Sequence, residues 1–79
     1  MTAKEMFEEL GYKEIYKQNT ITYRNFTSGC YPYYICFKLN KKTVYKSKVT
    51  CGKEVASSIK MNELKAITQQ VKELNWDNE

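Results

Sequence analysis

The alternation of apolar and polar side chains in residues 31–48, YPYYICFKLNKKTVYKSK, restricts the fold more than any other feature of this sequence. A period of two is typical of a β-strand with one buried face and one face toward solvent. The positions suited to burial are Tyr33, Ile35, Phe37 and Leu39. The positions suited to a half-exposed face are Tyr34, Cys36 and Lys38. Asn40 favours a turn because it tolerates positive φ, so the stretch predicts an antiparallel hairpin.

The register of the return strand, residues 43–48, is left open by the sequence. A two-residue loop pairs Phe37 with Val44, whereas a three-residue loop pairs Phe37 with Tyr45. A slip of one residue moves every side chain of a strand to the opposite face of the sheet. The choice therefore decides which face carries Tyr45 and Lys46.

Helical spacing of apolar residues marks both ends of the chain. Thr2 and Glu5 have the spacing of a capping box, and Gly11 can end a helix in the left-handed conformation, which predicts a short helix over residues 3–10. A second helix is predicted from apolar residues that recur every three or four positions: Met61, Leu64, Ile67, Val71 and Leu74. We expect these stripes to pack on the sheet, with Trp76 at the edge of the core.

Two further strands are predicted before the hairpin, over residues 12–17 and 20–26. In the first, Ile15 lies on one face, and Glu14 and Tyr16 lie on the other. The second alternates the pair Ile21 and Tyr23 with the pair Thr22 and Arg24. Residues 50–58, which include Gly52, are expected to form a loop.

The resulting order is helix, four strands, helix. This order predicts a single two-layer α+β domain over residues 1–79. The sheet is expected to be an antiparallel four-stranded β-meander. One of its faces would be covered by the short N-terminal helix and the amphipathic C-terminal helix, and the other face would be open.

The composition argues against an enzyme, a metal site and a cofactor. Histidine is absent, so Ser–His and Cys–His pairs cannot form within the chain, and the three glycines are isolated rather than grouped in a phosphate-binding loop. Cys30, Cys36 and Cys51 lack CxxC spacing and are expected to be small hydrophobic residues in a reducing cytosol. The alternative is that Cys30 is an exposed, reactive thiol.

Hydropathy and charge narrow the range of partners. No apolar run approaches the roughly 18 residues that span a bilayer, so we expect a cytoplasmic protein with no membrane contact. The net charge is +4, but residues 11–60 hold ten lysines and arginines against two glutamates. The positive charge therefore gathers on the predicted sheet, where it would favour an anionic partner.

The open face of the sheet is the candidate binding surface. Aromatic rings beside cations can stack on bases and neutralise phosphates. The candidate ligand-binding residues are Tyr16, Arg24, Tyr34, Lys38, Tyr45, Lys46 and Lys48. The ligand would be single-stranded nucleic acid or a nucleotide. The alternatives are an ordinary solvated face, or a surface that recognises a target protein, and an open sheet edge could also form a homodimer.

Four segments carry a resemblance to a known group of proteins: TAKEMFEELGYKEIY, ITYRN, YYICFKLNKKTVYK and MNELKAITQQVKELNW. Together they resemble small uncharacterised proteins encoded by phages and prophages of low-GC Gram-positive bacteria. The shared motifs are caps, turns and core faces, so no active-site residue is transferred. The resemblance implies an accessory binding protein in the host cytoplasm. Such a protein would antagonise a host defence or nucleic-acid process by blocking a protein or by sequestering a nucleotide signal.

Overall fold

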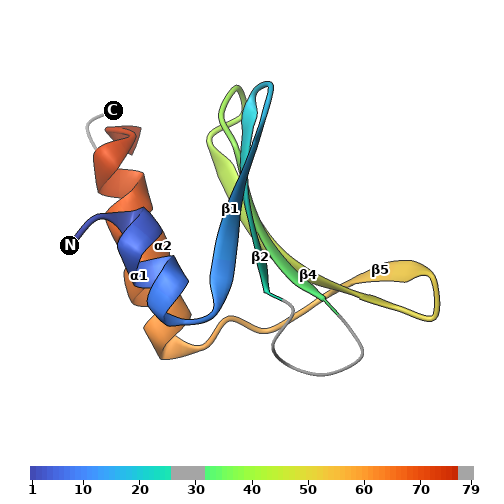
Figure 1. The fold of residues 1–79 in the computed structure, drawn as a ribbon. Coiled ribbons are helices and arrows are strands. Elements are labelled where there is room, and N and C mark those ends of the chain that lie inside the picture. The colour runs from blue at the N-terminus through green and yellow to red at the C-terminus, as the bar shows by residue number, and fades with distance from the viewer. Residues whose placement is uncertain (26–31, 77–79) are drawn as a thin grey trace.

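Two helices lie on one face of a twisted antiparallel sheet in the computed structural model, which describes residues 1–25 and 32–76 (Figure 1). The elements are α1 (Ala3–Glu9), β1 (Tyr12–Lys17), β2 (Thr20–Asn25), β3 (Tyr33–Lys38), β4 (Thr43–Thr50), β5 (Lys53–Ala56) and α2 (Met61–Glu73). The predicted α+β class, with a helix before and a helix after an antiparallel sheet, is confirmed. Two predictions concern residues outside the described ranges: the end of the second strand at Phe26 and the reactive thiol of Cys30.

The prediction of four strands is wrong, because the sheet has five strands in the order β1-β2-β3-β4-β5. The expected loop over residues 50–58 is a tight hairpin in which Thr50 pairs with Lys53. Both residues between them have positive φ, 51° at Cys51 and 76° at Gly52, as a two-residue hairpin of the primed type requires. Cysteine rarely adopts this conformation, so its presence concealed the turn.

The register of β3 and β4 pairs Phe37 with Val44 and Cys36 with Tyr45. This is the register of the shorter-loop alternative, although residues 39–42 separate the last pair, Lys38 and Thr43, and it places Tyr45 on the open face. The positive φ of this turn lies at Lys42 rather than at Asn40. The β3–β4 turn also contacts the β1–β2 turn, because the Leu39 N–H donates to the Asn19 carbonyl at 2.9 Å.

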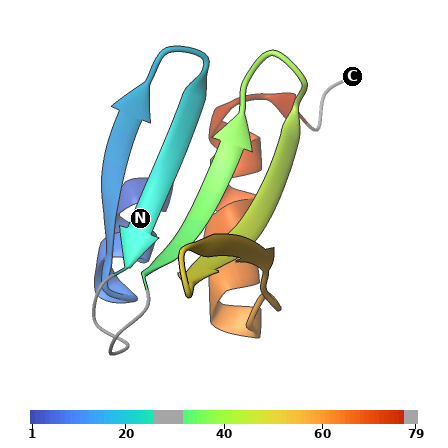
Figure 2. The same cartoon turned by 90° about the vertical axis from the view of Figure 1, so that its right-hand side faces the viewer.

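The helices run antiparallel beside each other on the face of the sheet opposite the viewer in Figure 2. The predicted capping box of α1 is present: the Glu5 N–H donates to Thr2 Oγ1 at 3.2 Å, and the Thr2 N–H donates to Glu5 Oε1 at 2.9 Å. The start of α1 is tied to the end of α2, since the Ala3 N–H donates to Glu73 Oε2 at 2.7 Å.

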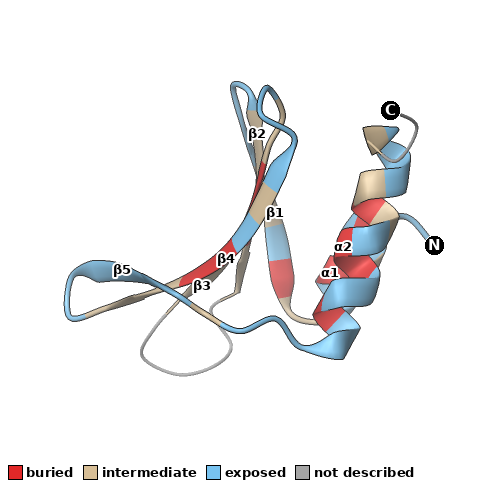
Figure 3. Cartoon of the chain, turned by 180° about the vertical axis from the view of Figure 1, so that it is seen from behind, coloured by how far each residue is buried: buried red, intermediate tan, exposed pale blue. Residues whose placement is uncertain are grey.

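Aromatic rings fill the space between the layers. The buried residues, red in Figure 3, lie on both helices and on the strands. Phe7 stacks on Tyr23 with ring centroids 3.9 Å apart, and Phe37 meets both rings edge-on. Trp76 packs against Phe37 at the margin, as predicted. The buried apolar cluster consists of Ala3, Phe7, Tyr12, Tyr23, Ile35, Phe37, Ala66 and Ile67.

The predicted buried stripe of α2 is partly wrong. Leu64 is 43% exposed and Met61 is 70% exposed, whereas Ala66 and Ile67 are buried. Two polar residues, Glu63 and Gln70, are also buried on this face. Gln70 accepts a hydrogen bond from the Tyr23 hydroxyl at 2.7 Å, and Glu63 binds groups of the sheet described below. The buried face of α2 is therefore rotated relative to the predicted stripe, although Ile67, Val71 and Leu74 of that stripe still pack in or against the core.

This packing predicts different costs for two truncations. Phe37→Ala is expected to lower the free energy of unfolding by about 3–5 kcal/mol, because it removes a fully buried ring and leaves a cavity. Leu64→Ala is the matched control, and its exposed side chain predicts a loss of about 1 kcal/mol or less. Urea unfolding followed by circular dichroism measures both values. Equal losses would contradict the rotation of α2.

Candidate functional site

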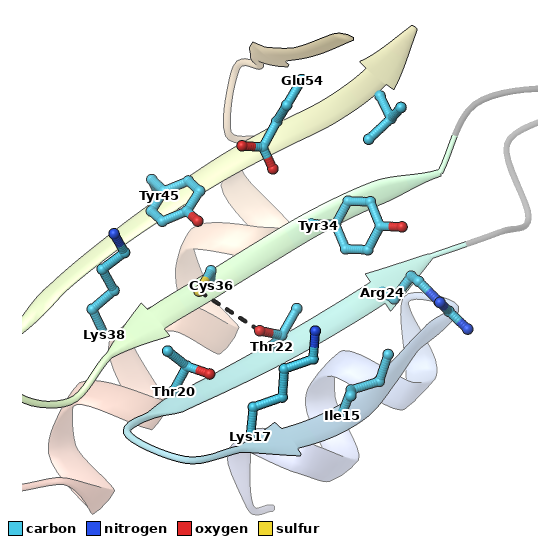
Figure 4. A pocket seen from close by; sticks show the side chains of 11 residues that line it. Ile15, Lys17, Thr20, Thr22, Arg24, Tyr34, Cys36, Lys38, Tyr45 and Glu54 are labelled. Atoms are coloured by element: carbon cyan, nitrogen blue, oxygen red, sulfur yellow. Dashed lines mark hydrogen bonds between the residues drawn. The ribbon is translucent and has the colours of Figure 1, made fainter. Parts of the chain in front are cut away.

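The face of the sheet away from the helices is hollowed into a groove of about 480 Å³, which we call the open-face groove (Figure 4). β4 and β5 bend away from the helices and form one wall (Figure 1). Because alternate residues of a strand point to the same face, one parity of each strand supplies the lining. The lining residues are Ile15, Lys17, Thr20, Thr22, Arg24, Tyr34, Cys36, Lys38, Tyr45, Val49 and Glu54.

Four of the seven candidate residues lie together in this groove: Arg24, Tyr34, Lys38 and Tyr45. They come from three neighbouring strands, β2, β3 and β4. The Nζ atom of Lys38 lies 5.6 Å from the centroid of the Tyr45 ring, a cation–π distance. Two of the predicted cations, Arg24 and Lys38, therefore share the groove with two of the predicted tyrosines.

The placement of Tyr16 on the open face is wrong. Tyr16 pairs with Ile21 and shares the parity of the buried Tyr12, so it belongs to the helix-facing side of the sheet. It is 69% exposed. Ile15 instead lines the groove. The sequence analysis assigned the two faces of β1 the wrong way round, because it placed Ile15, the most apolar side chain of the strand, in the core.

Lys46 and Lys48, two candidate residues on the strand whose register the sequence left open, do not lie on the open face. Lys46 pairs with Ile35, and Lys48 pairs with Tyr33, so both lysines share the helix-facing side with the core. The ammonium of Lys46 is 2.8 Å from Glu63 Oε1, and both side chains are less than a tenth exposed. Lys48 borders a separate hollow of about 290 Å³ beside the start of α2. The register of β4, which the sequence left open, accounts for both placements.

Glu63 makes three hydrogen bonds in the interface between sheet and helix. It accepts from Lys46 Nζ at 2.8 Å, from the Tyr12 hydroxyl at 2.7 Å and from the Lys60 N–H at 2.9 Å. Burial acts to raise the pKa of Glu63, but the bonds from Lys46, Lys60 and Tyr12 outweigh it and hold that pKa below its usual value. Glu63 is thus charged in the folded protein and fixes α2 on β1 and β4.

Lys17 and Glu54 are groove residues that the sequence interpretation missed. Lys17 shares the parity of Ile15, so the correct orientation of β1 would have identified it. Glu54 enters the groove from β5, the strand that was read as a loop. The buried Ser47 hydroxyl donates to Glu54 Oε2 at 3.0 Å. The groove therefore contains both cations and a carboxylate among its lining residues.

Tyr45 and Cys36 are adjacent on the floor of the groove, where their strands pair. The interaction with the Cys36 thiol, then burial, and then the nearby charge of Glu54 raise the pKa of Tyr45 to about 12. The phenol is therefore neutral at physiological pH and can donate a hydrogen bond. The Thr22 hydroxyl lies 3.6 Å from Cys36 Sγ, and the thiol is buried.

Within residues 1–25 and 32–76, no three cysteine or acidic side chains converge in a way that could hold a metal ion. Neither α1 nor α2 is long and apolar enough to cross a membrane. Comparisons with protein-family models, curated proteins and solved structures find no match to this chain.

The contacts of Glu63 predict how stability depends on pH. A carboxyl group with a lowered folded pKa stabilises the protein above its unfolded pKa of about 4.3, and this stabilisation is lost as the pH falls through the folded pKa. Glu63→Gln should cost about 3 kcal/mol at pH 7, because it leaves the Lys46 ammonium buried without a counter-charge. The difference from the wild type should shrink below about pH 4.

Urea unfolding of the wild type and of Glu63→Gln at about pH 7, 5, 4 and 3 measures this difference. Glu9→Gln is the control, since Glu9 is an exposed carboxylate on α1. A pH-independent difference between Glu63→Gln and the wild type would contradict a charged, buried Glu63.

Proposed function

We propose that this protein is a non-catalytic binding module for nucleotide units, taken either as free nucleotides or within a single strand, and that the open-face groove is its binding surface. The observation that carries the proposal is the meeting of three cations and two tyrosine rings in one groove of about 480 Å³. The cations are Lys17, Arg24 and Lys38. The rings are those of Tyr34 and Tyr45.

The spacing of the cations supports a phosphate-bearing ligand. Lys17, Arg24 and Lys38 come from β1, β2 and β3, which are consecutive in the sheet. Lys17 and Lys38 both lie opposite Thr20 in the sheet, and Arg24 lies four residues farther along β2, opposite Tyr34. Cations spread across and along the strands in this way can follow a short length of sugar-phosphate backbone.

The tyrosines supply the sequence-tolerant part of the binding. Tyr34 on β3 and Tyr45 on β4 line the same groove as the cations. Stacking of a base on an aromatic side chain contributes about 1–3 kcal/mol. The neutral phenol of Tyr45 adds a hydrogen-bond donor without placing a negative charge near the phosphate.

Strand β5 favours a second candidate function, recognition of a protein. All four residues of β5 are exposed, and β5 is at one edge of the described sheet. An edge strand can pair with an added strand of another chain through its main-chain groups. This surface is next to the groove, and the two functions are compatible.

For the biological role we propose what the resemblance to phage proteins implies: an accessory protein that antagonises a host defence or nucleic-acid process. Binding without catalysis is sufficient for this role, because sequestering a nucleotide signal or covering a single strand requires only affinity. The affinity for a single strand would be salt-dependent, since phosphate contacts release counterions.

Charge reversal in the groove tests the binding surface. Lys38→Glu should weaken binding of a fluorescein-labelled thymine pentanucleotide at least tenfold at low salt and reduce the salt slope by about 0.7 for each phosphate that is no longer neutralised. Lys41→Glu makes the same charge change at an exposed turn position outside the groove and should have a small effect. Tyr34→Ala should weaken binding roughly 5- to 150-fold because the base no longer stacks on the ring.

Fluorescence anisotropy at two salt concentrations measures these affinities, and competition with unlabelled mononucleotides distinguishes free nucleotides from single strands. Equal losses in Lys38→Glu and Lys41→Glu would show that the attraction is only a matter of net charge. Absence of binding to every oligonucleotide and nucleotide at low salt would overturn the proposed function.

A further inference from the structure

The charges in the open-face groove differ from one side of the sheet to the other. The cations Lys17, Arg24 and Lys38 come from β1, β2 and β3. Glu54, the acidic residue among those lining the groove, comes from β5 at the other side. Its carboxylate reaches over β4 toward the space between Tyr45 and Tyr34 (Figure 4). The groove therefore has its cations on β1, β2 and β3 and its carboxylate on β5, with Tyr34 on β3 and Tyr45 on β4 between β2 and β5.

The Glu54 carboxylate is held in this position. Ser47, which is only 3% exposed, donates its hydroxyl hydrogen to Glu54 Oε2 at 3.0 Å. Val49 of β4 pairs with Glu54 of β5, so the backbone that carries the carboxylate is part of the sheet. A carboxylate has about four lone-pair positions, and Ser47 occupies one of them. Both oxygens can therefore accept hydrogen bonds from a ligand.

A nucleotide has the same polarity as this groove. Its phosphate is anionic, and the edge of its base carries N–H groups that can donate hydrogen bonds. From β2 to β4 there are two strand spacings, or about 10 Å, which is comparable with the reach of one nucleotide from phosphate to base edge. A nucleotide bound with its phosphate on Arg24, which lies opposite Tyr34, would thus place its base at Tyr34 and Tyr45, with the base edge toward Glu54.

We infer that Glu54 is a specificity-determining residue that selects bases by their N–H donors, with guanine preferred. This inference rests on the proposed function and names the ligand class of the same groove. Guanine presents an imino N–H and an amino group side by side, which match the two oxygens of a carboxylate. Adenine and cytosine present an amino group beside an acceptor nitrogen. Uracil and thymine present one imino N–H between two carbonyl oxygens, and these oxygens are repelled by the carboxylate.

The test presents each base in two formats, as its 5′-monophosphate and as the central base of a thymine pentanucleotide. Isothermal titration calorimetry at low salt measures the affinity of each. The wild type should bind the guanine ligands most tightly and the uracil or thymine ligands most weakly, with about a tenfold range, as expected for a charge-assisted pair. Glu54→Gln should reduce guanine affinity by about tenfold and leave uracil and thymine affinity unchanged or improved, because an amide also donates.

Two further variants complete the test. Ser47→Ala, which keeps the carboxylate but removes the hydroxyl that orients it, should give a smaller loss of guanine preference. Glu9→Gln makes the same charge change as Glu54→Gln at an exposed position on α1 and should leave the preference intact.

Each outcome bears on a separate statement. If the wild type binds all bases equally, or if Glu54→Gln keeps the guanine preference, the role of Glu54 is overturned while the binding function stands. If no ligand binds in either format, the proposed function itself is overturned.

Discussion

The buried contact between Lys46 and Glu63 is the interaction on which the arrangement of the two layers depends. A buried ammonium and a buried carboxylate are each costly to remove from water, and they are tolerated when they pair and are otherwise hydrogen-bonded. Here the ion pair measures 2.8 Å, and Tyr12 and the Lys60 N–H complete the shell of the carboxylate. Any other rotation of α2 or register of β4 would separate the two charges.

This constraint also determines what the open face can carry. With Lys46 and Lys48 on the helix-facing side, the other parity of β4 supplies Tyr45, Ser47 and Val49 to the open face. The hairpin of β4 and β5 then brings Glu54 over Ser47. The charge of the groove therefore changes sign across the sheet, with cations on β1, β2 and β3 and the Glu54 carboxylate on β5. The helix-facing ion pair and the open-face groove are thus two consequences of one register.

The sequence predicted much of the fold because local signals were strong. The capping box at Thr2, the first strand over residues 12–17 and the burial of Ile35 and Phe37 on β3 all agree with the structure. It failed where a polar tertiary contact overrode an apolar pattern: Leu64 is exposed because Glu63 is buried against Lys46. Strand β5 was missed because Cys51 gives no turn signal although its φ is 51°. Of the candidate site, Arg24, Tyr34 and Lys38 were placed on the correct face and Tyr16 on the wrong one, whereas the face of Tyr45, Lys46 and Lys48 depended on the non-local register of β4.

Ligands should bind on the open face and not in the smaller hollow beside α2. Chemical-shift mapping of the ¹⁵N-labelled protein with a short single-stranded oligonucleotide tests this most directly. We expect the perturbed amides to cluster on the groove strands around Arg24, Tyr34, Lys38 and Tyr45. Perturbations centred on Lys48, Ser57 and Lys60, which line the other hollow, would contradict binding on the open face.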